Sequence, residues 1–190
     1  MKNFSITATA LLILFAVIGG MNMQTSTRET TDRVEELKNF YSLKPHVEGG
    51  SFAEVYTAPF QSDGRATAGS IFFLLEGADV SHFHQIDCDE IWYYHEGCGL
   101  KIFTIKDGGA EEILLGGDVK LNHRAMVVIP AGTVFAAENL DKDSYTFVSC
   151  ATTPKFSYDG FKLFSRQEIL KIYPAASENI LRFADSEVLQ

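Results

Sequence analysis

Residues 81–97, with the sequence SHFHQIDCDEIWYYHEG, combine three histidines, an acidic cluster and four aromatic side chains. Side chains in a β-strand alternate between its two faces, so His82 and His84 are expected on the same face. A turn over residues 86–89 would return the carboxylate of Glu90 to that surface. Two imidazoles and one carboxylate form the facial triad that binds Fe(II), and the same set suits Zn(II) or Mn(II). The spacing therefore predicts that His82, His84 and Glu90 hold a divalent metal ion.

A second interpretation of these residues needs no metal. Buried acids require partners and histidines can supply them, so the same side chains could hydrogen-bond to one another in a polar pocket. His95 has the opposite strand parity to Glu90 and is expected on the other face of the strand. The stretch by itself leaves both interpretations open.

His46 and Glu48 lie in the segment PHVEGG, which ends in Gly49 and Gly50. An imidazole and a carboxylate at this spacing are candidates for an acid–base pair at the rim of a pocket. The alternative is a solvated loop in which the two glycines only permit a tight turn. We interpret His46 and Glu48 as candidate catalytic residues.

Aromatic residues accompany the polar cluster. Trp92 and Tyr94 share the strand parity of Glu90, so they are expected to follow its carboxylate along one face. The candidate ligand-binding residues are Trp92, Phe135 and Phe73. Their rings would form a wall on which a planar or sugar-like ligand stacks. Such rings more commonly fill the core of a fold, which is the alternative interpretation.

Mostly short strands must position these residues. Residues 32–41, DRVEELKNFY, have apolar side chains at helical spacing, with Asp32 and Glu35 placed like a capping box, which predicts a short helix. The S-x-x-E pattern at residues 165–168 predicts another helix that Pro174 ends, and a further helix is expected at 177–183. Between them lie seven short apolar or alternating runs separated by turn residues: FAEVYT, SIFFLL, EIWYYH, LKIFTI, EEILL, AMVVIP and YTFVSCA. This pattern predicts an all-β antiparallel sandwich or barrel with short flanking helices.

Length and charge restrict the class of protein. The chain has 190 residues, which suits a single domain, here placed at residues 32–190. Its net charge of −9 repels nucleic acid phosphates and anionic lipid headgroups, so no nucleic acid partner is expected.

Residues 1–22 have the layout of a secretory signal peptide, with a lysine ahead of an uncharged apolar run. The run is shorter than the roughly 20 residues that a membrane-spanning helix needs. We therefore expect a secreted or extracytoplasmic protein with no membrane contact after signal removal. The alternative is an uncleaved segment that tethers the protein to the membrane.

The three cysteines, Cys88, Cys98 and Cys150, are an odd number, so no complete disulfide framework is inferred. A strand over residues 90–96 would hold Cys88 and Cys98 about 20 Å apart, beyond the Cα separation of about 7 Å that a disulfide allows. We expect no bond between them.

Two segments resemble the motifs of the cupin superfamily. The segment GADVSHFHQIDCDEIWYYHEG, residues 77–97, is similar to the first motif, in which a glycine precedes His-x-His and a glutamate precedes a second glycine. The segment PAGTVFAAEN, residues 130–139, is similar to the second motif, P-x-G-x-x-H-x-x-x-N. Phe135 stands where that motif has a histidine, the fourth metal ligand.

The chain also resembles one cupin family, cupin_5 (DUF985), over nearly the whole predicted domain. The resemblance is carried, in order, by LKPHVEGG, SIFFLLEG, SHFH, DEIW, VIPAG, SYTFVSC and EILKIYP. Where that family commonly has F-R-E-T-Y, residues 52–56 of this chain read FAEVY, which lacks the arginine.

The resemblance implies a double-stranded β-helix, or jelly roll, that pairs as a homodimer and has its pocket inside the barrel mouth. It implies a small-molecule ligand, sugar-like or an organic acid, held beside Fe, Mn or Zn by His82, His84 and Glu90. Isomerase, lyase or oxygenase chemistry would then fit.

Two alternatives follow from the same resemblance. One is a metal-free enzyme similar to sugar-epimerase cupins, in which a histidine and a tyrosine move protons; Tyr94 is the candidate tyrosine. The other is a non-catalytic ligand-binding or storage-type jelly roll. Fold does not determine function in this superfamily, so the reaction class stays open.

Overall fold

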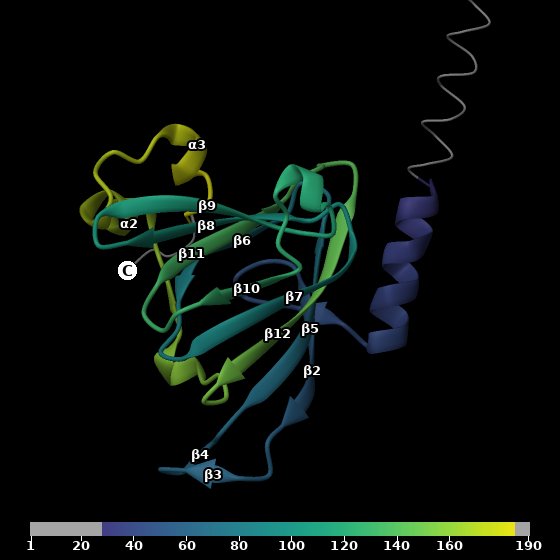
Figure 1. The fold of residues 1–190 in the computed structure, drawn as a ribbon, viewed down its shortest axis with the longest axis horizontal. Coiled ribbons are helices and arrows are strands. Elements are labelled where there is room, and N and C mark those ends of the chain that lie inside the picture. Colours follow the sequence, from purple (N-terminus) through teal and green to yellow (C-terminus); the bar gives the residue numbers. More distant parts are fainter. Residues whose placement is uncertain (1–27, 185–190) are drawn as a thin grey trace, which may run out of the picture.

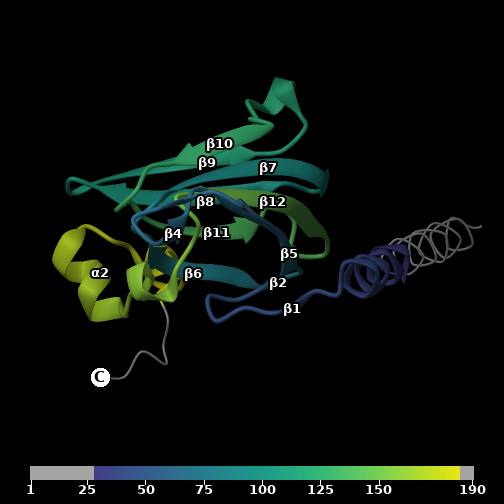
Figure 2. The same cartoon turned by 90° about the horizontal axis from the view of Figure 1, so that it is seen from below.

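The computed structural model describes residues 28–184, so the signal peptide expected at residues 1–22 lies outside the described residues. Two β-sheets face each other, and short helices flank them at both ends of the described chain (Figure 1 and Figure 2). Neighbouring strands within both sheets pair antiparallel. The predicted all-β jelly roll with flanking helices is therefore confirmed.

The larger sheet has six strands. In spatial order they are β1 (Lys44–Pro45), β2 (Ser51–Thr57), β5 (Gly69–Glu76), β12 (Tyr145–Thr153), β7 (Asp89–Gly97) and β10 (Met126–Ile129). Strand β7 is the one predicted from the EIWYYH run, and it holds Cys88 and Cys98 at opposite ends. All three cysteines have free thiols.

The smaller sheet has five strands. They are, in spatial order, β13 (Lys162–Leu163), β6 (Val80–Gln85), β11 (Val134–Asn139), β8 (Leu100–Lys106) and β9 (Gly109–Leu115). A separate hairpin of β3 (Gln61–Ser62) and β4 (Arg65–Ala66) extends from one end of the molecule (Figure 1). Two short 3₁₀ helices occupy loops, at Val119–Leu121 and Tyr158–Gly160.

Three buried clusters hold these layers together. The largest contains Phe73, Trp92 and Phe135 and lies between the inner faces of the sheets. A second cluster packs the C-terminal helices against the smaller sheet, with Ile169 fully buried at its centre. In the third, Val34 of the N-terminal helix packs on the outer face of the larger sheet. Removal of this apolar surface from water is the main force that stabilises the fold.

The helices form where the sequence predicts them, with one correction. The N-terminal helix covers residues 28–41, so Asp32 lies inside it and does not begin it. The C-terminal helices are α2 (Arg166–Ile172) and α3 (Glu178–Leu181). The capping box predicted at Ser165 is present: its hydroxyl accepts from the Glu168 backbone N–H, and the Glu168 carboxylate accepts from the Ser165 N–H. None of the helices described in residues 28–184 has the length and apolar character to cross a membrane.

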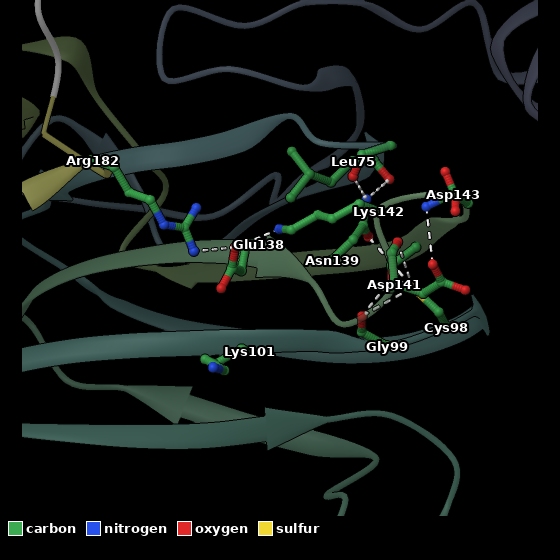
Figure 3. A network of polar contacts seen from close by, with 12 residues as sticks. Leu75, Cys98, Gly99, Lys101, Glu138, Asn139, Asp141, Lys142, Asp143 and Arg182 are labelled. Carbon is green, nitrogen blue, oxygen red and sulfur yellow. Dashed lines mark hydrogen bonds and ion pairs between the residues drawn. The ribbon is translucent and has the colours of Figure 1, made fainter. Parts of the chain in front are cut away.

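Polar contacts around β11 connect the C-terminal segment and the two sheets (Figure 3). The buried carboxylate of Glu138 accepts from both Arg182 and Lys142. Next to it, the Asn139 amide donates to the carbonyl oxygen of Leu75 at 3.0 Å, which joins β11 of one sheet to β5 of the other. Satisfied buried polar groups of this kind fix the relative position of the elements that they join.

Candidate active site

The predicted metal ligands do not share one face. Where β6 pairs with β11, His84 lies opposite Phe135 and Ser81 lies opposite Ala137. The interval is three residues on β6 but two residues on β11, so β6 contains one extra residue there. This β-bulge interrupts the alternation between Ser81 and His84. The Nδ1 atom of His82 lies 3.2 Å from the Phe183 carbonyl oxygen, whereas His84 approaches Glu48. The common face expected for the two histidines is therefore wrong.

These residues do not fit a metal centre in the arrangement that the structure gives them. Among residues 28–184, no group of three or more His, Cys, Asp or Glu side chains is placed to hold a metal ion. The fourth cupin ligand position is occupied by Phe135, whose ring packs on the His84 imidazole with centroids 4.1 Å apart. We therefore derive no chemical step through a metal.

Glu48 is the centre of a buried polar cluster. Its Oε2 atom lies 3.3 Å from Nδ1 of His46 and 3.4 Å from Nε2 of His84. Its Oε1 atom accepts a hydrogen bond of 2.9 Å from the Ser81 hydroxyl. Burial by itself would raise the pKa of Glu48, but the two histidines and the serine outweigh it and lower that pKa below its usual value. Glu48 is therefore a carboxylate at neutral pH.

The double glycine places Glu48 in this cluster. The turn between β1 and β2 is closed by a hydrogen bond from the His46 N–H to the Gly50 carbonyl, and both glycines have positive φ. A Cβ atom on Gly49 would lie 2.0 Å from the Val80 carbonyl oxygen, so only glycine lets the loop approach β6 this closely. The Glu48 carbonyl then accepts a 2.7 Å bond from the His82 N–H. The glycines thus position the acid as well as permit the turn.

The two imidazoles have different partners. Nδ1 of His84 lies 2.7 Å from the His82 carbonyl oxygen, which can only accept, and its Nε2 atom faces the Glu48 carboxylate at 3.4 Å. Both nitrogens of His84 therefore face oxygen atoms. Nδ1 of His46 faces the same carboxylate, while its Nε2 lies 3.4 Å from the Tyr158 hydroxyl. Nδ1 of His46 also lies 3.5 Å from the Glu48 backbone N–H, which can only donate, so the two contacts of this nitrogen favour opposite tautomers.

Glu90 is the second acid of the site, and its state is the opposite of that of Glu48. It lies on the inner face of β7, is buried, and has no ion-pair partner in the described part of the chain. Burial, with the negative charge of Glu48 as a second cause, raises the pKa of Glu90 to about 8, although Trp92 and Cys150 act in the other direction. Glu90 is therefore mainly a neutral carboxylic acid at pH 7.

His46 and Glu90 line one pocket of about 250 Å³. The walls are mainly aromatic or apolar, and the thiol of Cys150 and the hydroxyl of Thr152 reach it from β12. The residues around the pocket are His46, Phe52, Glu54, Gly69, Ser70, Ile71, Glu90, Cys150, Thr152, Lys155, Phe156 and Tyr158. A mainly apolar pocket lined by an imidazole and a protonated carboxylic acid can move protons on a bound molecule.

The other candidate residues lie away from this pocket. Trp92, Phe135 and Phe73 belong to the central core and are at most 1% exposed, so the core interpretation of these rings holds. The Tyr94 hydroxyl donates to the Gly97 carbonyl oxygen at 2.7 Å and borders a separate cleft, so it does not reach His46. His95, as expected, is on the opposite face of β7 from Glu90, against Phe72 and Phe147.

Sequence reasoning missed the residues that β12 and the following loop contribute to the pocket. Cys150 and Thr152 share one face of β12 by strand parity, and Thr152 pairs directly with Glu90. Phe156 and Tyr158 follow in an aromatic-rich segment, FSYDGF, that the sequence analysis did not interpret. The density of aromatic residues after Pro154 was the available signal.

Comparison with known proteins identifies the family. The family model described as Cupin_5, cupin superfamily (DUF985), matches residues 35–164. The chain belongs to the Cupin_5 family. The resemblance stated from the segments around His46, His82 and Glu90 is therefore confirmed.

Two solved structures illustrate the likeness of this cupin to its relatives. A crystal structure of a protein from Shewanella oneidensis is 32% identical, with a TM-score of 0.75, covering 80% of this chain and 96% of that one. A hypothetical protein from Leishmania major is 26% identical, with a TM-score of 0.73. The match covers 79% of this chain and 97% of that one. No curated protein matches the chain in sequence.

Proposed function

We propose that this cupin binds a small carbonyl compound and catalyses proton transfer at the carbon beside the carbonyl group, as an isomerase does. The observation that carries the proposal is the pairing, in one pocket, of an imidazole oriented by a buried carboxylate with a carboxylic acid that keeps its proton. This is the metal-free alternative raised by the sequence, with Glu90 in the place of the expected tyrosine.

The proposed step uses groups of this chain alone. Nε2 of His46 takes the proton from the substrate carbon, and the electron pair of that C–H bond forms a C=C bond. The carbonyl oxygen receives the proton of Glu90, which gives a neutral enol. Glu48 holds His46 in the tautomer with a free Nε2 and stabilises the imidazolium that forms. Return of the His46 proton to the same carbon, or to a further carbon conjugated with the enol, and of the enol O–H proton to Glu90 completes exchange or isomerisation.

The apolar lining of the site supports this chemistry. Phe52 and Phe156 line the pocket together with His46 and Glu90. In such an environment an electrostatic interaction with a developing charge is stronger than in water. The Tyr158 hydroxyl occupies the hydrogen-bonding position of His46 Nε2, and the substrate would replace it there.

The test is deuterium exchange, because it needs no knowledge of the product. A panel of small ketones, aldehydes and lactones would be incubated with the protein in D₂O and followed by proton NMR. We expect loss of the signal of the carbon-bound proton beside the carbonyl. His46→Gln and Glu90→Gln should each reduce the exchange rate by about 10²–10⁴-fold, the usual contribution of a general acid or base.

His95→Gln is the matched control, because His95 lies on the opposite face of β7 and hydrogen-bonds to Ser149. Its exchange rate should stay within about twofold of the unaltered protein, well below the effect of losing a general base. Equal rates for His46→Gln and His95→Gln would refute the mechanism. Binding of panel members without any exchange would instead leave the protein as a non-catalytic binder.

A further inference from the structure

We infer that this pocket selects an uncharged, flat carbonyl compound, and that Glu54 determines this selectivity by occupying Lys155. The inference rests on the proposed function for the carbonyl group, but the charge and shape of the ligand follow from the pocket alone. Every charged group at the pocket is balanced by a neighbour, and the aromatic walls suit a planar molecule.

Lys155 is the one lysine or arginine among the residues that line the pocket, and it is already paired. Its ammonium lies 2.8 Å from Oε1 of Glu54 and 2.7 Å from the Thr57 hydroxyl, both on β2. A Cβ atom on Gly69 would lie 2.8 Å from Cγ of Lys155, so this glycine lets the lysine stem lie flat against β5. The stem is thereby directed along the strand toward Glu54, and no free ammonium is left to receive a carboxylate ligand.

The two buried acids, Glu48 and Glu90, likewise offer no free positive charge to a ligand. The carboxylate of Glu48 faces the imidazoles of His46 and His84, and the Glu90 carboxyl is buried without a lysine or arginine beside it in residues 28–184. An anionic ligand in the pocket would lie beside Glu90 and find no free cation as a partner, and an unpaired charge in such a site is costly. An ammonium ligand would stabilise the ionised form of Glu90, and so favour loss of the proton that the reaction requires. Only an uncharged ligand leaves both proton-transfer groups in their working states.

The walls favour a flat ligand. Phe52 meets the His46 ring edge to face with centroids 4.7 Å apart, and Phe156 meets Tyr158 in the same way at 5.0 Å. These rings come from β2 and from the loop after β12, so they approach the pocket from two elements. Aromatic rings from these two elements suit contact with a planar conjugated group such as an enol or enone.

Three probes of equal size and shape test the inference: benzamide, which is neutral, benzoate, which is anionic, and benzamidinium, which is cationic. Their dissociation constants for the full-length protein would be measured by ligand-observed NMR or calorimetry at pH 7. We expect benzamide to bind at least about tenfold more tightly than benzoate, a difference of about 1.4 kcal/mol.

The Glu54→Gln variant tests directly whether Glu54 determines the selectivity. Glu54 is on the exposed side of the pocket rim, so the variant should fold, and it removes the partner of Lys155. Benzoate affinity should then rise by about tenfold while benzamide affinity changes little. Glu111→Gln, on the exposed strand β9, removes the same charge far from the pocket and should leave all three constants unchanged.

Benzoate or benzamidinium binding as tightly as benzamide to the unaltered protein would overturn the inference. So would equal benzoate affinities in Glu54→Gln and Glu111→Gln, or no binding of any probe at millimolar concentration. The result is separable from the proposed function: probe selectivity with no deuterium exchange would retain an uncharged-ligand pocket and reject the catalysis. Deuterium exchange without probe selectivity would retain the catalysis and reject the uncharged-ligand pocket.

Discussion

At the residue scale, the two buried glutamates show how surroundings divide one residue type into two chemical roles. Glu48 meets two imidazoles and a hydroxyl, and it stays charged. Glu90 meets an indole and a thiol, neither of which can neutralise a carboxylate, and it keeps its proton. A pair of acids with pKa values moved in opposite directions is a feature of acid–base sites, which is why Glu90 rather than Tyr94 is the acid in the proposed reaction.

Glu90 should also make stability depend on pH. Its pKa is about 8 in the folded state and near 4.5 in the unfolded state, so between these values the folded protein binds the extra proton. Stability should therefore fall as pH rises from about 4.5 to 8, by up to about 1.4 kcal/mol per pH unit. Glu48 does not oppose this, because its lowered pKa acts only below about pH 4.5.

The measurement is urea unfolding at pH 5.5 and pH 8 for the parent, Glu90→Gln and Glu111→Gln. The decrease between the two pH values should be present in the parent and in Glu111→Gln, and largely absent in Glu90→Gln. A parent protein that gains stability over this interval, or an unaltered decrease in Glu90→Gln, would show that Glu90 titrates normally.

At the element scale, the β1–β2 turn is the element that brings His46 and Glu48 onto β6. Its close approach depends on Gly49, which has a φ of 107° and no room for a Cβ atom. The bulge in β6 completes the arrangement, because it turns Ser81 and His84 toward the same carboxylate.

Gly49→Ala should therefore cost much more stability than a substitution that only strains the backbone. We expect a loss of about 3 kcal/mol or more, because the β1–β2 turn must move away from β6. Gly64→Ala is the control: φ is 79° there, but no atom lies within 4 Å of the new Cβ, so backbone strain alone should cost about 1–2 kcal/mol. Denaturant unfolding of both variants gives the comparison, and equal losses would mean that the contact with Val80 is unimportant.

At the scale of the whole molecule, the homodimer stays a prediction, and the structure suggests where a second copy would bind. Within residues 28–184, strand β10 pairs with β7 alone and forms one edge of the larger sheet. On the outer face there, Met126, Val128 and Tyr93 are 49%, 46% and 37% exposed. An apolar face at an open sheet edge is a site where chains associate.

We expect light scattering to report twice the chain mass, and Val128→Lys to shift the protein toward the monomer, because it puts a charge in the interface. Val119→Lys introduces the same charge at a position that is 82% exposed in a loop, and it should leave the mass unchanged. A parent protein that stays monomeric throughout a concentration series would refute the dimer. A dimer insensitive to Val128→Lys would place the interface elsewhere.

The sequence by itself determined many elements of this protein. Alternating apolar runs predicted seven of the strands, though not β11, and the S-x-x-E pattern at Ser165 predicted a helix start that the structure has. These features depend on neighbours within a few residues, so they can be read locally. The same is true of the double glycine after Glu48, which marked the turn, and of His95, whose strand parity placed it away from Glu90.

The tertiary structure alone decided the site. The bulge that separates His82 from His84 arises from pairing with β11, and the pocket joins His46 to Glu90 and Tyr158 through strands and loops distant in sequence. The proton on Glu90 depends on burial and on the charge of Glu48, neither of which a linear pattern contains. Strict alternation assumed a regular strand, whereas register and burial are set by long-range packing, and these determine which groups meet and in which charge state.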